Sequence, residues 1–313
     1  MSKATRRFIV NKILEMLITL VVVTLISFLL VRLSPIDPAE AYARRSFAAF
    51  SFTDEQMEAL REDMGLNEPL PVQYVTWVRD ALHLDFGESF VSGQPVFEKV
   101  TTAIGITVTI VLISAVIQAV FILLFGCLCY LTRKRMIGHA LIFLCIAGVS
   151  IPSFFFASTY LDIFAVKLGL TSVVGNTGLM RYLPAAVCIA IGCIALFSPM
   201  LANNIEKEME QDSAFYARCR GLSEGKILLR YALPSAVVTL LPSFCQMLAI
   251  VERVFSLPGL GYLIIDSVLY RDSPVIHATI LFLAFSLVMF NILSDVLRRI
   301  LQRDTSSREG ARL

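Results

Sequence analysis

The sequence lacks the motifs with which proteins usually bind a nucleotide or hold a catalytic metal. It contains no GxxxxGK[ST] phosphate loop and no HExxH motif. The three histidines, His83, His139 and His277, are far apart in the chain, and the seven cysteines form no CxxC pair. Free cysteine behaves as a small buried hydrophobe, so we interpret the cysteines as packing residues. We expect no catalytic residue, no metal site and no bound cofactor in this chain, so that any ATP and magnesium would be used by partner subunits.

Charged residues are also scarce. Asp, Glu, Lys and Arg make up 17% of the 313 residues, apolar residues make up 57%, and the mean hydropathy is +0.74. Soluble domains average about 25% charged and about 45–50% apolar residues. The composition therefore predicts a protein built for a lipid bilayer, and its net charge of +2 is too small to indicate nucleic-acid binding.

Long apolar runs predict the membrane helices. A bilayer core requires about 20 apolar residues in a helix. Six runs approach or exceed that length, at residues 8–33, 104–131, 140–166, 183–202, 236–251 and 276–300. We therefore expect an all-α membrane protein with six transmembrane helices. The first run is too long for the core of a signal peptide.

The distribution of basic residues predicts the orientation of these helices. Cytoplasmic loops carry an excess of Lys and Arg, and an inside N-terminus places most of the 27 Lys and Arg on the inner side. The short loops agree, because residues 133–135 read RKR, whereas Lys167 and Arg181 stand alone on the other side. We expect both termini in the cytoplasm.

Residues 34–100, after the first helix (1–33), predict a small extracytoplasmic subdomain. Residues 53–65 read TDEQMEALREDMG, which is typical of a short helix with Thr53 as N-cap and Gly65 at its end. The single tryptophan, Trp77, follows in an amphipathic segment and is expected at the membrane interface. The predicted core, with the other five helices, spans 101–303, and residues 304–313 form a cytoplasmic tail.

Pro152 lies within the third predicted membrane helix. A proline there removes a helix hydrogen bond and permits a kink. A static kink and a moving hinge are both compatible with the sequence.

A polar, basic segment at residues 212–234 separates the fourth and fifth apolar runs and lies in the predicted cytoplasmic loop 204–234. Small residues recur along one face of its first part, at Ala214, Ala217 and Gly221. Because small residues allow another surface to approach closely, we expect this face to project toward a partner.

The rest of the segment predicts a turn and a second helix. Arg218 and Arg220 could meet carboxylates of a partner, and Gly221 permits a left-handed turn. A second helix is expected over residues 223–233 and is expected to stop at Pro234. The alternative interpretation is a plain helix lying in the membrane interface.

This segment resembles the EAA loop of ABC-importer permeases, whose pattern is EAA-x3-G-x9-I-x-LP. Residues 217–222 read ARCRGL, similar to the ARAKGL of the peptide/nickel branch, and residues 215–216 read FY in place of Glu and the first Ala. The positions that match the pattern are Ala217, Gly221, Leu233 and Pro234.

Other segments resemble motifs of the dipeptide/oligopeptide/nickel permease family over nearly the whole chain. They are residues 35–39 (PIDPA, similar to PGDPA), 65–74 (similar to GLDxPLxxQY), 84–89 (similar to GDLGxS), 252–261 (similar to ExxFxxPGxG) and 271–274 (RDSP). The resemblance implies the type I ABC importer permease fold.

The resemblance also implies function and partners. The chain would be the permease subunit of an ATP-driven importer in the bacterial cytoplasmic (inner) membrane. It would form a heterodimer with a second, homologous permease and work with two ABC ATPase subunits and an extracytoplasmic solute-binding protein. The residues implied to couple to the ATPase are Ala214, Ala217, Arg218, Arg220, Gly221, Leu222, Leu233 and Pro234. Those implied on the gate or binding-protein side are Glu252, Phe255, Pro258, Gly259, Gly261 and Asp272.

The solute is the least determined part of this interpretation. The family carries peptides, glutathione and nickel or nickel chelates, and residues 72–87 look closest to nickel-type members. No substrate-binding residue is assigned. An alternative of another class is a secondary transporter or channel, which would be expected to show ionisable groups at the membrane midplane and inverted repeats; neither is visible.

Overall fold

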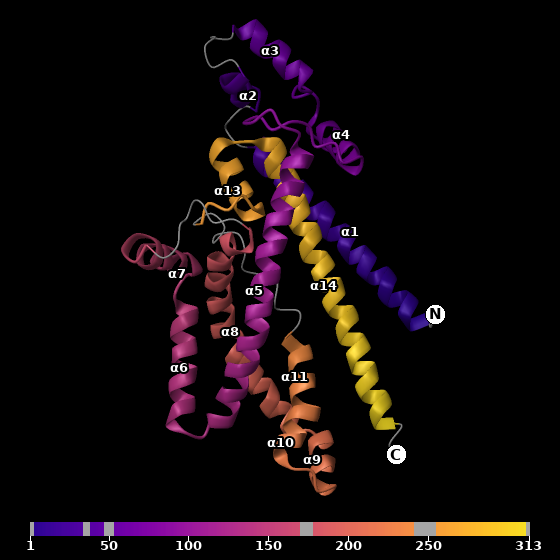
Figure 1. Ribbon diagram of the computed structural model, residues 1–313. Helices are drawn as coiled ribbons and strands as arrows, with labels where there is room; N and C mark the ends of the chain where they lie inside the picture. The colour runs from indigo at the N-terminus through magenta and orange to yellow at the C-terminus, as the bar shows by residue number, and fades with distance from the viewer. Residues whose placement is uncertain (1–2, 34–37, 47–52, 170–177, 241–254, 311–313) are drawn as a thin grey trace. The chain divides into compact units, whose positions relative to one another are not determined.

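Every regular element of the described residues is helical, which confirms the all-α class. The computed structural model describes residues 3–33, 38–46, 53–169, 178–240 and 255–310. Figure 1 shows the helices in chain order. The longest are α1 (Lys3–Arg32), α5 (Val96–Thr132), α8 (Leu183–Met209) and α14 (Ser273–Gly310).

Three of the predicted membrane helices are each long and apolar enough to cross a bilayer alone, namely those in α1, α5 and α8. In α14 the apolar part runs over Ser273–Met289 and is shorter. The fifth predicted helix begins as α11 (Leu233–Leu240), and the rest of it lies outside the described residues. The count of six helices and their orientation therefore stay predictions.

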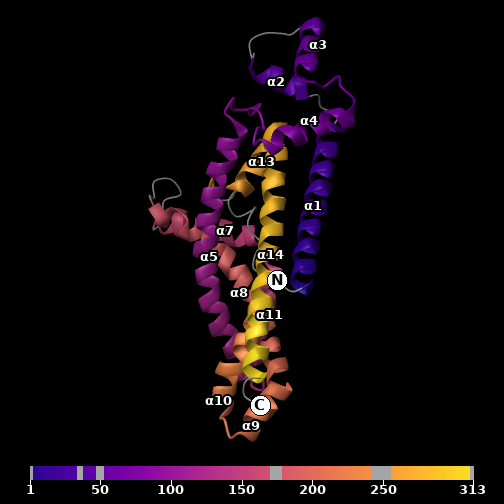
Figure 2. The ribbon, with the colours of Figure 1, turned by 90° about the vertical axis from the view of Figure 1, so that its right-hand side faces the viewer.

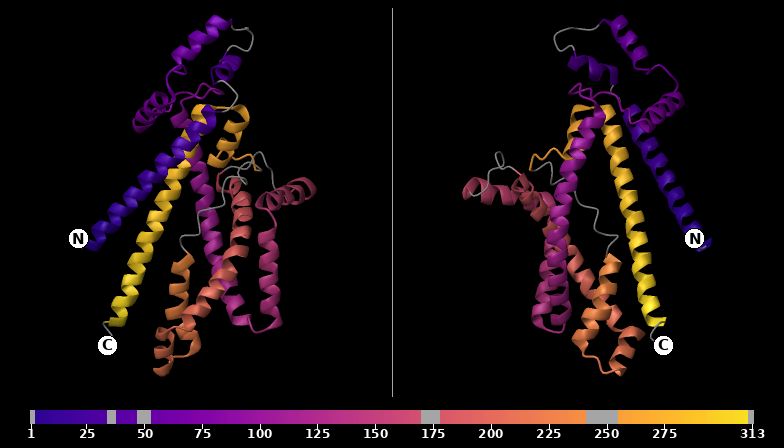
Figure 3. Two further views of the ribbon diagram at one scale, coloured as in Figure 1. Left: turned by 180° about the vertical axis from the view of Figure 1, so that it is seen from behind. Right: turned by 45° about the vertical axis from the view of Figure 1, so that its right-hand side comes forward.

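The third predicted helix, residues 140–166, is wrong as one continuous element. The chain forms α6 (Met136–Ser150) and then α7 (Ser153–Tyr160), which continues as a π-helical turn, and the axes differ by 93° (Figure 3). Pro152 is the N-cap of α7, and Ile151 before it is extended, with φ −90° and ψ 122°. A residue that precedes proline disfavours the helical conformation, so the helix breaks here instead of kinking.

The chain divides into two compact units. The first consists of Met1–Thr107 and Pro258–Met289, and the second of Val108–Leu257 and Phe290–Leu313. The first unit contains three short helices that follow α1, together with α13. They are α2 (Pro38–Ser46), α3 (Asp54–Asp63), α4 (Leu70–Leu82) and α13 (Leu260–Tyr270).

Local sequence rules account for α3. Thr53 is its N-cap and forms a capping box with Gln56, in which each side chain bonds the backbone N–H of the other residue. Gly65 follows the helix with φ +63°. The predicted start and end of this helix are confirmed.

An apolar core and an aromatic cluster hold the first unit together. The core joins the start of α5 to α13 and α14, through Phe86, Val96, Val100, Ala103, Leu260, Leu263, Val275 and Ala278. In the aromatic cluster, Tyr74 and Trp77 of α4 meet Phe28 of α1 and His277 of α14, and α4 lies across the end of α1 (Figure 2). Ser27 Oγ lies 3.0 Å from Nδ1 of the buried His277, so a hydrogen bond also ties α1 to α14.

The second unit is organised around α8. The apolar stretch of α8 is 61% buried, against 17% for α1 and 22% for α5. It contacts α6, α7, α9 (Asp212–Cys219) and α11. We conclude that α8 is the core helix of this unit, whereas α1 and α5 leave most of their apolar surface for lipid or a partner.

Glycines allow the neighbouring helices to approach α8 closely. A Cβ at Gly126 of α5 would lie 2.7 Å from Leu201, and a Cβ at Gly148 of α6 would lie 3.0 Å from the Cβ of Ala195. Small residues at helix contacts are the usual means of packing in membranes. A third glycine, Gly138, shapes the turn between α5 and α6, since its Cβ would lie 2.7 Å from the Arg133 Cα.

We predict that Gly138→Ala destabilises the protein by about 1–3 kcal/mol, the range typical of overpacking, because the added methyl meets backbone that cannot move aside. The matched control is Gly192→Ala in α8, where the space around a Cβ is open and alanine favours the helix by up to about 1 kcal/mol. Thermal unfolding in detergent compares them. Equal melting temperatures for the two variants would contradict the prediction.

Candidate functional site

The predicted coupling segment is a helix, a left-handed turn and a second helical stretch, as expected. The helix α9 starts after the turn at residues 210–211 that follows α8. The negative charge of Asp212 in its first turn is stabilised by the positive N-terminal end of the helix dipole. The second stretch begins with α10 (Glu224–Ile227) and continues into α11 (Figure 1).

Gly221 closes α9 with a Schellman motif. Its own N–H donates to the Arg218 carbonyl at 2.8 Å, and the N–H of Leu222 donates to the Ala217 carbonyl at 3.2 Å. Gly221 has φ +78°, a conformation that costs an L-residue free energy. The left-handed turn predicted here is therefore confirmed.

The direction predicted for the small-residue face is wrong for its two alanines, whereas Gly221 is exposed. Ala214 is 0% exposed and Ala217 is 3% exposed, and α9 contacts α8, α10 and the π-helical turn Leu228–Ala232. The two alanines therefore let α9 pack closely on its own chain. They do not project toward a partner.

The outward face of α9 carries aromatic rings instead. Phe215 is 58% exposed and Tyr216 is 66% exposed, and their ring centroids lie 6.1 Å apart. Arg220, which caps the C-terminal end of α9, is also exposed.

Arg218 is held within the chain. Its guanidinium forms a fork on Glu224, with Nε–Oε1 at 2.7 Å and Nη2–Oε2 at 3.2 Å, and Nη2 also donates to the Met209 carbonyl at 3.1 Å. The same hydrogen bonds lower the pKa of the Glu224 carboxyl and raise the pKa of the Arg218 guanidinium. Arg218 thus joins α9 to α10 and to the last turn of α8. The carboxylate that it meets belongs to its own chain and not, as the sequence suggested, to a partner.

The prediction that Pro234 stops the second helix is also wrong. Leu233 and Pro234 are the first residues of α11, which directly follows the π-helical turn. The N–H of Leu233 donates to the Leu228 carbonyl, five residues back. A π turn is wider than an α turn, so it accommodates a proline that lacks an N–H and whose ring would clash in a regular helix.

The turn also contains a string that resembles a catalytic motif. Residues 221–225 read GLSEG, which matches the GxSxG pattern of hydrolase nucleophiles. That motif places its serine between a strand and a helix. Here Ser223 lies between two helices as the N-cap of α10, so the match carries no catalytic meaning.

The gate-side residues fall in different units. Glu252 lies outside the described residues. Phe255, in the second unit, is buried, with its ring centroid 6.0 Å from that of Tyr160. Pro258 is exposed and begins the part of the first unit that leads into α13.

Two glycines shape the start of α13. Gly259 is its N-cap, and Gly261 in its first turn is buried. The N–H of Leu260 donates to Thr107 Oγ1 of α5 at 2.8 Å. An otherwise unsatisfied N–H at the start of a helix is thereby bonded, and α13 is fixed to α5 at this end.

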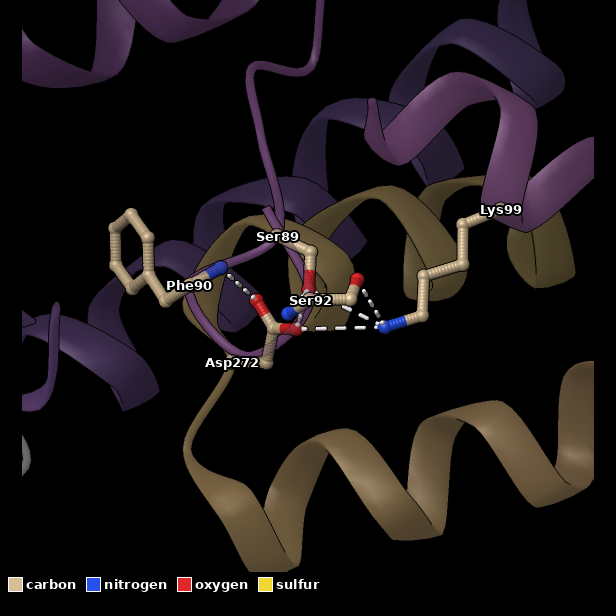
Figure 4. A network of polar contacts seen from close by, with 5 residues as sticks. All are labelled: Ser89, Phe90, Ser92, Lys99 and Asp272. Atoms are coloured by element: carbon tan, nitrogen blue, oxygen red, sulfur yellow. Dashed lines mark hydrogen bonds and ion pairs between the residues drawn. The ribbon is translucent and has the colours of Figure 1, made fainter. Parts of the chain in front are cut away.

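Asp272 fixes the other end of α13. Its carboxylate accepts from Ser89 Oγ at 2.5 Å and from the Phe90 N–H at 2.9 Å, and Lys99 Nζ lies 3.8 Å away (Figure 4). Ser92 completes the network through Lys99. Asp272 is 1% exposed, and a buried carboxylate requires such partners. It therefore ties the loop before α5 to the α13–α14 turn.

Comparison with known proteins identifies the family. Residues 122–307 match the family described as binding-protein-dependent transport system inner membrane component. Residues 5–112 match the N-terminal part described for the membrane component of such systems. The chain belongs to this permease family.

Relatives of the permease are named for the transport of different solutes. A Brucella abortus permease protein named for a peptide transport system is 30% identical over 305 residues, covering 92% of this chain and 95% of that protein. The metal-staphylopine import system permease protein of Staphylococcus aureus is 28% identical over 313 residues, covering 98% and 99%. The glutathione transport system permease protein of Shigella boydii is 29% identical over 297 residues, covering 93% and 95%.

A solved structure supports the fold. The permease matches an inward-facing structure of the MetNI methionine ABC transporter with a TM-score of 0.50 at 17% identity, covering 64% of this chain and 95% of that chain. The type I permease fold is thereby confirmed. The permease is a multi-pass membrane transport component, and its family decides against a secondary transporter or channel.

Sequence reasoning missed the partners of the charged residues in the permease. Glu224 lies only six residues beyond Arg218, across the glycine turn, so this ion pair is the one that local sequence could have indicated. Ser89 and Lys99 lie 183 and 173 positions from Asp272, so no local pattern links them. In the described residues no group of three or more His, Cys, Asp or Glu side chains could hold a metal ion.

We predict that Gly221→Ala loosens the end of α9, because an L-residue in this conformation costs about 1–2 kcal/mol. Amide hydrogen exchange of residues 212–227 should increase accordingly. Gly225→Ala is the matched control, since its φ is not positive and a Cβ there meets no atom within 4 Å. Equal exchange in the two variants would show that the left-handed turn is not the constraint.

Proposed function

We propose that the permease is driven by ATP hydrolysis on partner subunits and that residues 204–234 receive the force. The observation that carries the proposal is the exposed aromatic pair on α9, a helix whose inner face is packed on the core helix α8. Exposed apolar patches mark interaction sites, and aromatic side chains are typical of the anchors of a protein interface.

The permease would act in a complex. We infer a heterodimer with a second, homologous permease, two ABC ATPase subunits that bind ATP and magnesium, and an extracytoplasmic solute-binding protein. Both termini would lie in the cytoplasm of a bacterium whose inner membrane holds the complex. Residues 34–100 and the start of α13 would then lie on the outer side, toward the binding protein.

The coupling residues would have distinct tasks in this arrangement. Ala214 and Ala217 would seat α9 on its own chain, and the turn at residues 221–222 would fix the angle to α10. The joint at residues 233–234 would pass motion to α11. Arg220 would meet the ATPase, beside the aromatic pair.

The gate-side residues would act by position. Asp272 would keep the outer end of α14 and the loop before α5 together, and Gly259 and Gly261 would set the approach of α13. Pro258 would lie on the exposed surface, and Phe255 would pack within the second unit. For Glu252 we propose a structural or gate-side role.

We predict that Phe215→Ala combined with Tyr216→Ala weakens binding of the ATPase subunit by about 2 kcal/mol or more, roughly 30-fold in Kd, as for aromatic anchors of interfaces. Pull-down with purified ATPase at graded concentrations measures the change. Phe143→Ala, which removes a 73% exposed ring from α6, is the control. Unchanged affinity in the double variant would contradict docking through α9.

For the solute, we propose nickel or a nickel chelate, with di- or oligopeptides or glutathione as the alternative. The resemblance of residues 72–87 to nickel-type members favours the metal chelate, and a relative named for metal-staphylopine import supports it. Relatives named for peptide and glutathione transport support the alternative.

We predict that the reconstituted complex, with its binding protein, hydrolyses ATP faster when nickel–histidine is added. Parallel samples receive a dipeptide mixture, glutathione or histidine alone, and phosphate release is measured in each. Stimulation by dipeptides or glutathione without any response to nickel–histidine would refute the nickel proposal. It would leave the importer proposal intact.

A further inference from the structure

Two arginines converge on the last turn of α8 from different parts of the second unit. Arg218 of α9 donates to the Met209 carbonyl at the end of α8. Arg133, in the turn between α5 and α6, forms an ion pair with Glu206, three residues earlier on α8. Glu206 and Met209 both lie in the last turn of α8, so the two arginines contact the same turn, one through a side chain and the other through a backbone carbonyl.

Each arginine is fixed on its own side. Arg218 is oriented by the fork on Glu224 described above. The guanidinium of Arg133 lies over the Tyr130 ring, 5.1 Å from its centroid, and the turn that carries it is shaped by Gly138. Neither side chain is therefore a free surface cation.

The helices behind these contacts are already packed together. The close approaches at Gly126 and Gly148 hold α5 and α6 against α8. By contrast, the backbone joins α8 to α9 only through residues 210–211. The buried alanines Ala214 and Ala217 let α9 pack closely on its own chain, but small apolar side chains make no directional contact. Arg218 supplies the directional contact between them.

We propose that Arg133 and Arg218 brace the last turn of α8 from two sides, so that a displacement of α9 moves α8 and the α5–α6 turn as one body. The inference rests on the proposed coupling function and adds the residues that transmit the movement beyond the docking helix. Both arginines are positioning residues, because neither touches solute or nucleotide.

The burial of these pairs determines what their loss should change. The side chains are 32% and 40% exposed for Arg133 and Glu206, and 39% and 65% exposed for Arg218 and Glu224. Ion pairs exposed to this degree add little to stability. Their removal should therefore leave the fold intact while it loosens the angle between α9 and α8.

The first test measures the brace without transport. Hydrogen exchange of residues 206–224 in the purified permease should increase in Arg218→Gln and less in Arg218→Lys, which keeps the charge but not the fork. Lys167→Gln, which breaks the exposed ion pair with Asp162 elsewhere in the same unit, should leave this exchange unchanged. Unaltered exchange in Arg218→Gln would overturn the proposal.

The second test measures transmission in the reconstituted complex as solute taken up per ATP hydrolysed. Arg133→Glu and Glu206→Arg should each lower this ratio by about fivefold, within the range for residues along a coupling path, with ATPase capture unchanged. The doubly reversed pair should recover most of it. A ratio that stays unchanged in both single variants, or a swap that assembles but restores nothing, would overturn the proposal. Absence of ATP-dependent uptake in the unmodified complex would instead refute the proposed function, and the exchange measurement would then decide the brace.

Discussion

The hydrocarbon core of a bilayer offers no water to backbone amide and carbonyl groups, and the long elements of this permease follow from that constraint. The chain answers it with helices. Three of the described helix ends also satisfy their backbone groups locally, including two in the predicted cytoplasmic loop. The Leu260 N–H donates to the Thr107 hydroxyl, the N–H groups of Gly221 and Leu222 donate to the carbonyls of Arg218 and Ala217, and the Leu233 N–H donates to the Leu228 carbonyl. Where a side chain is buried with a charge, as in Asp272, partners from distant segments satisfy it.

Features that depend on neighbouring residues could be predicted from the sequence. Hydropathy alone located α1, α5 and α8, and capping rules located the start of α3 and the turn at Gly221. Features that depend on which part of the molecule packs against a segment could not be predicted from the sequence. A stripe of small residues indicates that something approaches closely, but the pattern is the same for a partner and for the chain's own helices. In α9 the approaching surfaces are those of α8 and α10. Pro152 is similar, because local rules permit a kink or a break and the surrounding packing decides between them.

The permease has no phosphate loop, so under the proposed function the energy must enter through a surface and travel through contacts. Among the described helices that could span a membrane, α8 has the most buried apolar stretch. A helix that is packed on several sides cannot shift without moving its neighbours. A force delivered near its end therefore reaches α6, α7 and α11, whereas the same force on α1, whose apolar surface is largely exposed, would reach few contacts.

The proposed brace suits this task because its ion pairs are weak. An ion pair exposed to this degree adds little to stability, too little to make the unit rigid against unfolding. An arginine fork nevertheless fixes direction, since its planar donors match a carboxylate in few orientations. Buried alanines let α9 pack closely on its own chain, and in the proposed brace Arg218 sets the angle between α9 and α8. Such a contact fixes the orientation of α9 on α8 but adds little to stability. It can therefore transmit a displacement while the unit remains free to change conformation.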